Sequence, residues 1–313
     1  MIGGGSFSGA RVVVTGSVGF IGTQLVQELA RGGAAVTGID RRAPAPGAPG
    51  KHLCFDLTSP DARSMLRGAL RDADAVFHLA ARPGVRGVGC EIDRARRRDN
   101  VEAGRHVLGL TPHHVPVVVT SSSSVYGGAR RDGTRLLASR ETDELVPRGG
   151  YARSKVALEA LCAQRAAGGG VVAVARPFTV AGEGQRPDMA LARWLEAAAG
   201  GQPIQVLGSL RRCRDVTDVR DVVRGLLALG LRGEPVTVNL GTGDPRTLGE
   251  LVDEVANVVG HPITVDVVAA GAEEPAATRA HTAKCRAVCG FVPQTDLADL
   301  VRRQWNRHVS LAA

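Results

Sequence analysis

The 313-residue sequence has no uninterrupted apolar run that approaches the roughly 20 residues needed to span a membrane. Its first residues, MIGGGSFSGA, lack the basic segment and the long apolar core of a secretory signal peptide. These absences predict a cytoplasmic protein with no membrane partner. With 44% hydrophobic and 22% charged residues, the chain has a globular composition and is long enough for one large domain or two small ones.

Aromatic residues make up only 3% of the chain, and most of its 39 basic residues are arginines. Nowhere do aromatic side chains alternate with basic ones to form a surface on which nucleic-acid bases would stack. We therefore predict no nucleic-acid partner. The net charge of +8 is equally suited to attracting a small phosphorylated substrate.

The six cysteines are scattered, and no two of them form a CxxC pair. In a cytoplasmic chain they are expected to be reduced and mostly buried. Cys285 and Cys289 lie four residues apart on a predicted helix, but no histidine or second cysteine pair completes a set of four ligands. No metal site is predicted.

Short apolar runs alternate with segments of helical periodicity along the first half of the chain. Strands that alternate with helices of about 10–15 residues form βαβ units and a parallel sheet. With right-handed crossovers, the simplest α/β fold is a doubly wound parallel sheet, the Rossmann architecture. Strands are predicted at 11–15, 35–39, 52–57, 75–79, 115–120, 171–175 and 236–240, and helices at 20–31, 61–70, 94–110 and 151–167.

After residue 177 this alternation gives way to loops and short mixed elements. We expect residues 1–177, together with about 216–245, to form the dinucleotide-binding domain. Residues 178–215 and 246–313 are expected to form a smaller C-terminal substrate-binding lobe over the carboxyl edge of the sheet.

A glycine motif follows the first predicted strand, with Gly16, Gly19 and Gly22 at three-residue spacing. In a dinucleotide site the first glycine permits a tight turn, the second lets the backbone approach a pyrophosphate, and the third lets the helix pack closely on the strand. Asp40 ends the second strand about 20 residues further on, where a carboxylate accepts hydrogen bonds from the adenosine ribose. The motif predicts a bound dinucleotide.

The charge of Asp40 favours NAD, because a carboxylate repels the 2′-phosphate of NADP. Arg41 and Arg42 follow directly and are able to hold that phosphate instead, so NADP stays open as the alternative. Asp56 and Leu57, at the end of the third predicted strand, are placed to contact the adenine edge.

Tyr151 and Lys155 are four residues apart on a predicted helix and therefore share one face. A lysine ammonium close to a phenol stabilises the phenolate, so we expect Lys155 to lower the pKa of Tyr151. Such a tyrosine is able to take a proton from a substrate hydroxyl while hydride leaves the same carbon. The serines at 121–124 end the fifth predicted strand, where a hydroxyl can bond the reacting oxygen.

Several motifs occur in a fixed order: TGSVGFIG at 15–22, HLAA at 78–81, SSSSVYG at 121–127, YARSK at 151–155, RPFTV at 176–180 and RDVT at 214–217. Over about residues 10–305 the chain thereby resembles extended short-chain dehydrogenase/reductases of the nucleotide-sugar epimerase and dehydratase group. The resemblance implies a homodimer formed through helices 94–110 and 151–167. It also implies that Ser122, Tyr151 and Lys155 are catalytic.

The same resemblance implies two sets of binding residues. The cofactor set is Gly16, Gly19, Phe20, Ile21, Asp40, Arg41, Asp56, Leu57, Leu79, Ala80, Ala81, Tyr151, Lys155 and Pro177. The set that binds a UDP-sugar is Arg86, Ser122, Ser123, Thr179, Arg186, Val206 and Arg214, with Arg214 at the diphosphate and the strand around Val206 at the base.

The residues after Ser122 distinguish the reactions of this group. Its 4,6-dehydratases carry Asp-Glu there, and its uronate decarboxylases resemble Ser-Glu, whereas this chain has Ser123-Ser124. Because serine is no acid at neutral pH, we expect reversible oxidation at C4 without elimination, which is 4-epimerisation. A dehydratase, a decarboxylase and a non-catalytic dinucleotide-binding protein remain as alternatives.

Thr179 and Arg186, the latter in an RPDM segment, resemble residues that hold the sugar carboxylate in UDP-glucuronate 4-epimerases. The expected reaction therefore converts UDP-glucuronate to UDP-galacturonate. The alternatives are an epimerase of UDP-glucose or UDP-GlcNAc, with Arg186 binding phosphate or pairing with an acid. Ala181 and Glu183 replace the usual tyrosine and proline of the group.

Overall fold

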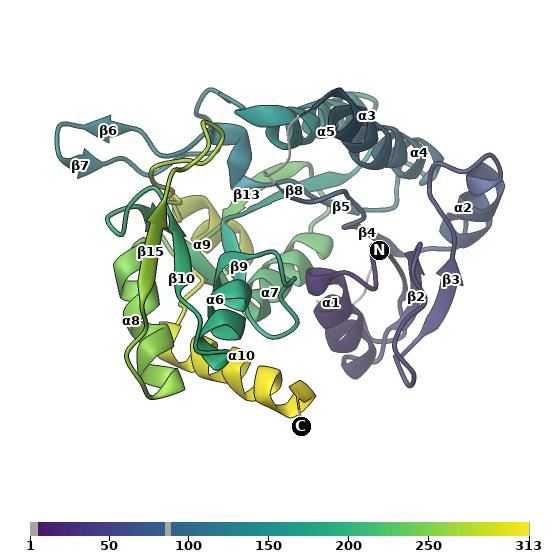
Figure 1. The fold of residues 1–313 in the computed structure, drawn as a ribbon. Helices are drawn as coiled ribbons and strands as arrows, with labels where there is room; N and C mark the ends of the chain where they lie inside the picture. Colours follow the sequence, from purple (N-terminus) through teal and green to yellow (C-terminus); the bar gives the residue numbers. More distant parts are fainter. Residues whose placement is uncertain (1–5, 85–88, 313) are drawn as a thin grey trace.

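A computed structural model describes residues 6–84 and 89–312 of the chain. Seven parallel strands form one sheet, in the order β13-β8-β5-β4-β1-β2-β3. Their bounds are Arg11–Thr15 (β1), Ala35–Asp40 (β2), Lys51–Cys54 (β3), Ala75–His78 (β4), Val117–Thr120 (β5), Val172–Pro177 (β8) and Val236–Leu240 (β13). The predicted doubly wound sheet is confirmed, and β13, the strand predicted at 236–240, joins it beside β8 (Figure 1).

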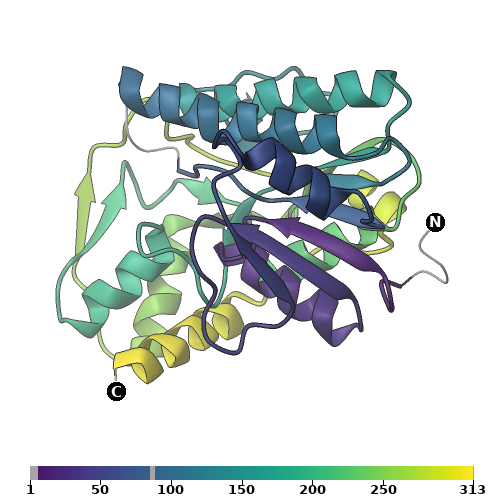
Figure 2. The same ribbon diagram turned by 90° about the vertical axis from the view of Figure 1, so that its right-hand side faces the viewer.

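Two hydrophobic cores cover the two faces of the sheet, because successive residues of a strand point to opposite sides. In β1, Val12 and Val14 belong to the core with α1 and α7, and Val13 belongs to the core with α2, α4 and α5. The result is a layer of helices on each side of the sheet (Figures 1 and 2). The helices are α1 (Phe20–Arg31), α2 (Ala62–Leu70), α4 (Ala103–Leu110), α5 (Gly149–Ala167) and α7 (Val219–Gly230).

Two predicted elements differ most from their bounds in the structure. The helix predicted at 94–110 already begins at α3 (Cys90–Arg96), after Gly89 with a φ of 128°, and reaches α4 through a π-helical segment, η2 (Arg97–Glu102). The strand predicted at 52–57 ends at Cys54, because Oδ1 of Asp56 accepts from the backbone N–H of Thr58 (2.8 Å) and turns the chain. Asp56 therefore lies in a turn just beyond the strand.

A third core lies over the carboxyl edge of the sheet and is built from helices and a short parallel pair of strands. It contains the buried side chains of Trp194, Leu251 and Leu300. Its elements are α6 (Ala190–Ala199), β10 (Ile204–Leu207), α8 (Leu248–Val259), β15 (Val265–Val268) and α10 (Leu297–Ala312). This lobe holds the second wall of a cavity described below.

The connections between sheet and lobe are short strands and one helix. β9 follows β8 directly and pairs with β12, so the chain leaves the sheet beside the start of α7. The remaining elements are η3 (Ser123–Tyr126), β6 (Arg131–Asp132), β7 (Arg135–Leu136), β9 (Thr179–Ala181), β11 (Cys213–Arg214), β12 (Val216–Asp218), β14 (Arg246–Thr247) and α9 (Ala283–Cys289).

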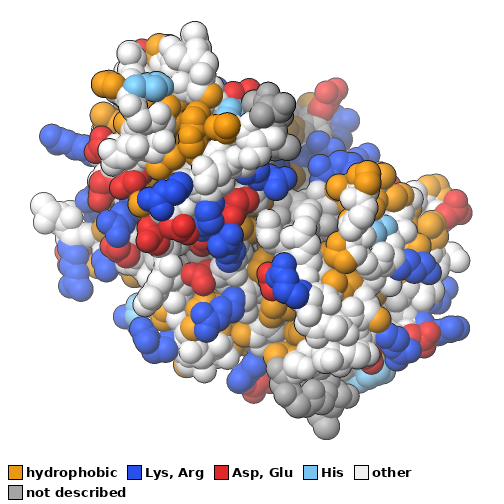
Figure 3. Space-filling model, turned by 90° about the horizontal axis from the view of Figure 1, so that it is seen from below, with side chains coloured by type: hydrophobic (Ala, Val, Ile, Leu, Met, Phe, Trp, Pro, Cys, Tyr) orange, Lys and Arg blue, Asp and Glu red, His pale blue; other side chains and the backbone are white. Residues whose placement is uncertain are grey.

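Surface charge is mixed on the face shown in Figure 3, where lysine and arginine side chains lie among aspartates and glutamates. In the parts of the chain that the structure describes, no helix combines the length and apolar character that crossing a bilayer requires.

Candidate active site

A cavity of about 1060 Å³ lies between the carboxyl edge of the sheet and the lobe. It sits where neighbouring strands β1 and β4 connect to opposite sides of the sheet, the usual place for ligands in open α/β folds. Every residue of the predicted cofactor set lines this cavity. Of the predicted substrate set, Ser122, Ser123, Thr179, Arg186 and Arg214 line it as well.

The glycine motif forms the tight turn between β1 and α1. Gly16 has a φ of 72°, and a Cβ added there would lie 2.6 Å from the backbone nitrogen of Ala80. A Cβ on Gly22 would lie 2.0 Å from the carbonyl oxygen of Gly16. Only glycine fits at these two positions, so the backbone itself lines the cavity where a pyrophosphate would meet the start of α1.

Asp40 presents its carboxylate at the end of β2. Its two oxygens accept from the backbone N–H groups of Val18 and Arg42, both at 3.1 Å. Arg42 also donates to the carbonyl oxygen of Val18 (2.8 Å), and Arg41 lies 3.4 Å from Asp56. Both arginines that might hold a 2′-phosphate are thus engaged with this chain's own oxygens, and the acidic acceptor at the ribose position fits NAD.

Asp99 is a cavity residue that sequence reasoning did not identify. Its side chain is 4% exposed and is surrounded by the guanidinium groups of Arg41 (3.4 Å), Arg82 (2.8 Å) and Arg98 (2.8 Å). These arginines come from three segments of the chain, so no short sequence motif predicts that they gather around Asp99. The neighbouring Asn100 lies buried away from the cavity lining.

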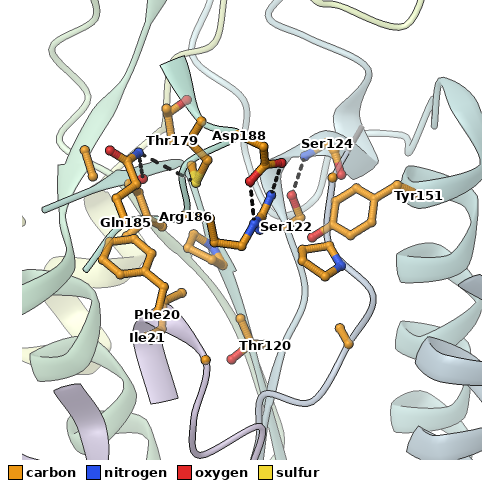
Figure 4. Close-up of a pocket in the computed structure, with 18 of the residues that line it drawn as sticks. Phe20, Ile21, Thr120, Ser122, Ser124, Tyr151, Thr179, Gln185, Arg186 and Asp188 are labelled. Carbon is orange, nitrogen blue, oxygen red and sulfur yellow. Dashed lines mark hydrogen bonds and ion pairs between the residues drawn. The ribbon is translucent and has the colours of Figure 1, made fainter. Parts of the chain in front are cut away.

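Tyr151 and Ser122 face each other in the cavity (Figure 4). Burial raises the pKa of Tyr151, while its hydrogen bond with Ser122 and the charges of Arg186 and Arg96 lower it. The net shift is upward. The phenol thus faces Ser122 at the wall of the cavity.

Lys155 lies beside Tyr151, but its ammonium points elsewhere. Nζ is 5.9 Å from the centre of the Tyr151 ring and donates to the carbonyl oxygen of Thr120 at 2.8 Å. Burial lowers the pKa of Lys155 to about 8. In this structure the groups that lower the pKa of Tyr151 are Ser122, Arg186 and Arg96, so the expected effect of Lys155 stays a prediction.

Arg186 and Thr179 come from the segment after β8 and line the cavity near Ser122 (Figure 4). The guanidinium of Arg186 forms a double hydrogen bond with Asp188, at 2.8 Å for both contacts. The pairing with an acid, left open by the sequence, is therefore present. Arg186 nevertheless remains one-third exposed and close enough to Tyr151 for its charge to lower the pKa of the phenol.

Arg214 lies at the lobe end of the cavity and also has an acidic partner. Its guanidinium donates to Glu274 at 2.5 Å and to the carbonyl oxygen of Cys213 at 2.9 Å. Both Arg214 and Glu274 line the cavity, and both are mostly buried. Glu274 was not among the residues predicted for the site.

Two predicted substrate residues are not found at the cavity wall. Val206 is fully buried in the lobe core, and the side chains that line the cavity from β10 are those of its neighbours Gln205 and Leu207. The prediction chose the wrong face of a strand whose side chains alternate. Arg86 lies outside the described residues.

Cys285 and Cys289 are two free thiols on α9, and Cys285 is buried. In the described part of the chain, no three His, Cys, Asp or Glu side chains are grouped so that they could hold a metal ion.

Comparison with known proteins bears on this arrangement. Residues 12–241 match the NAD dependent epimerase/dehydratase family. An uncharacterized UDP-glucose epimerase of Bacillus subtilis is 31% identical over 311 residues, which cover 92% of this chain and 95% of that protein.

Two solved structures with bound NAD are similar to nearly the whole chain. MoeE5 in complex with UDP-glucose and NAD has a TM-score of 0.88 and 34% identity, and the match covers 97% of this chain and 100% of that one. UDP-glucuronic acid 4-epimerase from Bacillus cereus, in complex with UDP-glucuronic acid and NAD, has a TM-score of 0.86 and 26% identity, with 96% and 99% covered.

Proposed function

The chain belongs to the NAD-dependent epimerase/dehydratase family, and we propose that it interconverts UDP-glucuronate and UDP-galacturonate by epimerisation at C4. NAD is its cofactor and, when bound, supplies the hydride acceptor and returns the hydride. The observation that carries the proposal is the shared cavity wall of Ser122, Tyr151 and Arg186, which combines a proton acceptor with a cation for a sugar carboxylate.

The proton steps belong to Tyr151 and Ser122. In our proposal Ser122 hydrogen-bonds the C4 oxygen. Tyr151 takes the hydroxyl proton in its phenolate form, which the charges of Arg186 and Arg96 favour against the effect of burial, while the C4–H bond breaks and its electron pair leaves as hydride. The 4-keto sugar turns over in the cavity. Hydride then returns to the opposite face of C4, and Tyr151 gives the proton back, so that no net oxidation remains.

The cavity also has to hold the carboxylate of the sugar so that it is not lost as CO₂. A 4-keto uronate is a β-keto acid, which readily loses CO₂. Hydrogen bonds from Ser123, Thr179 and Arg186 would hold the carboxylate out of the alignment that this loss requires. The serines at 123 and 124 also offer no acid for the elimination or proton transfer at C5 that a dehydratase needs.

The other parts of the proposal follow from this assignment. Residues 1–177 and about 216–245 hold NAD, and residues 178–215 and 246–313 hold the UDP-sugar, with Arg214 at the diphosphate. The protein acts as a homodimer through the face of α3, α4 and α5, whose helices lie side by side in Figure 2.

The test is a panel of UDP-glucuronate, UDP-glucose and UDP-GlcNAc, incubated with NAD-loaded protein and followed by mass spectrometry and NMR. We expect UDP-galacturonate from UDP-glucuronate, with unchanged mass. Turnover of a neutral UDP-sugar without any uronate turnover rejects the sugar assignment. Release of CO₂ with a UDP-pentose product rejects epimerisation in favour of decarboxylation.

A further inference from the structure

The loop that carries Arg186 is tied to the last helix of the chain. Nε2 of Gln304, in α10, donates to the carbonyl oxygen of Gly182 at 2.9 Å and to Oε1 of Gln185 at 2.6 Å. Gln304 is 7% exposed, so these two bonds replace hydrogen bonds to water that its amide lost on burial. We call residues 182–189 the Arg186 loop.

Ion pairs also hold the Arg186 loop in place. Glu183 pairs with Arg220 at 2.7 Å and with Arg303, the residue before Gln304. Arg303 also pairs with Asp218, and its side chain is only 15% exposed, so these ion pairs are weakly screened by solvent. Glu183 is thus an acid bound to two arginines, one of them in α10.

The loop backbone itself is folded into turns on both sides of Arg186. The N–H of Gln185 donates to the carbonyl oxygen of Gly182, and the N–H of Met189 donates to that of Arg186, both at 3.1 Å. Nε2 of Gln185 donates back to the carbonyl oxygen of Val180 at 3.2 Å. Gln185 is thus the link between α10 and the turn that precedes Arg186.

The tied loop sets where the guanidinium of Arg186 lies. Gln185, Arg186 and Asp188 all line the cavity, and Figure 4 shows the side chain of Arg186 pointing toward Ser122. A loop that is already ordered loses little conformational entropy when a ligand binds to it. A loop released from α10 would have to be ordered by the ligand itself.

We propose that Gln304 is a positioning residue for Arg186, and that it thereby sets the preference of the site for a sugar that carries a carboxylate. The inference rests on the proposed function, because it assigns Arg186 to the uronate. Gln304 touches no substrate atom in this scheme. Its effect is therefore expected only for carboxylate-bearing sugars and only while Arg186 is present.

The experiment measures binding of UDP-glucuronate, UDP-glucose and UDP by calorimetry. All proteins are NAD-loaded and carry Tyr151→Phe, so that no sugar is turned over. Adding Gln304→Met should weaken UDP-glucuronate about fivefold, the scale of one or two hydrogen bonds, and leave UDP-glucose and UDP within about twofold. With Arg186→Ala already present, Gln304→Met should have no further effect on UDP-glucuronate.

The matched control is Gln202→Met, because the exposed Gln202 amide reaches only the carbonyl oxygen of Gly200. Glu183→Gln provides a second, milder release of the loop and should show the same selectivity with a smaller loss. Glu183→Gln also tests the positioning role if Gln304→Met does not fold.

Equal weakening of all three ligands, or a Gln304→Met loss that persists without Arg186, overturns the positioning role. The positioning role is also overturned if the parent protein prefers UDP-glucuronate and the Gln304→Met and Glu183→Gln variants keep that preference unchanged. A parent protein that binds UDP-glucose but not UDP-glucuronate overturns the proposed function and the inference together.

Discussion

The two ends of the cavity are built in different ways. At the sheet end the binding groups are the glycine turn and the carboxylate of Asp40, which backbone N–H groups hold in place. At the lobe end the two cations assigned to the sugar nucleotide, Arg186 and Arg214, already pair with carboxylates of their own chain. The cofactor end is preformed, whereas an anionic ligand at the lobe end has to replace an internal anion.

This difference has a consequence for recognition. Leaving the mostly buried guanidinium of Arg214 without a partner is costly, so Glu274 stabilises the protein before the substrate binds, whereas the more exposed pair of Arg186 and Asp188 contributes little. A ligand gains only the difference between its own contacts and those that it displaces. The lobe end is therefore expected to select strongly charged ligands rather than to bind every anion tightly.

The largest expected effect is the loss of rate on replacing Tyr151, which lies between the two ends of the cavity. Tyr151→Phe removes the proton acceptor and should lower kcat by more than about 100-fold. The matched control is Tyr126→Phe, because the hydroxyl of Tyr126 is bound by Arg176 (2.8 Å) and donates to Asn239 (2.7 Å) in the core. That variant should lose stability but little rate. A Tyr151→Phe enzyme of near-normal rate would reject the role of the phenol.

The preformed cofactor end is tested by Gly22→Ala. Its Cβ would lie 2.0 Å from the carbonyl oxygen of Gly16, so the turn has to shift, and NAD affinity should fall by on the order of 100-fold. The measurement is a titration of tryptophan fluorescence with NAD. Gly68→Ala, in α2, is the control, because its Cβ meets nothing within 4 Å. Unchanged NAD affinity in Gly22→Ala would show that the turn is not preformed for NAD.

Lys155 gives a prediction about pH. Burial lowers its pKa from 10.5 to about 8, so between these values the unfolded chain binds a proton that the folded chain has released. Wild-type stability therefore gains from this group as pH rises through that window. Lys155→Met should be more stable than wild type near pH 7, and this advantage should shrink by up to about 3 kcal/mol toward pH 10.5.

Chemical denaturation at several pH values measures this difference in the free energy of unfolding. The control is Lys51→Met, which removes an exposed lysine from β3. A Lys155→Met difference that does not change with pH would mean that the lysine is not desolvated in the folded protein.

The smallest expected effect is a change in UDP affinity on replacing Glu274, and it tests whether an internal carboxylate competes with the ligand at the lobe end. Glu274→Gln removes the charge that competes for Arg214, so UDP should bind about threefold more tightly, because the mostly buried guanidinium then has only a neutral partner to give up. Calorimetry with UDP measures the change without any contribution from the sugar. Weaker binding in the variant would mean that Glu274 orients Arg214 for the diphosphate rather than competing with it.

The parts of the site that could be predicted are those whose chemistry lies in one short segment. The glycine spacing from Gly16 to Gly22 and the acid at Asp40 define their own geometry, because a turn, a helix start and a strand end follow each other directly. Tyr151 and Lys155 share a helix face for the same reason. Val206 was misplaced because strand periodicity defines two faces without saying which one meets the core.

The sequence by itself determined the parallel sheet, the dinucleotide turn and the residues available for proton transfer, because each depends on periodicity or spacing within about 30 residues. Only the tertiary structure decided how the charges are paired. Glu274 reaches Arg214 across 60 residues, and Gln304 reaches Gln185 across 119. Such pairs form only when packing of the lobe on the sheet brings distant segments together, and no local pattern encodes that packing.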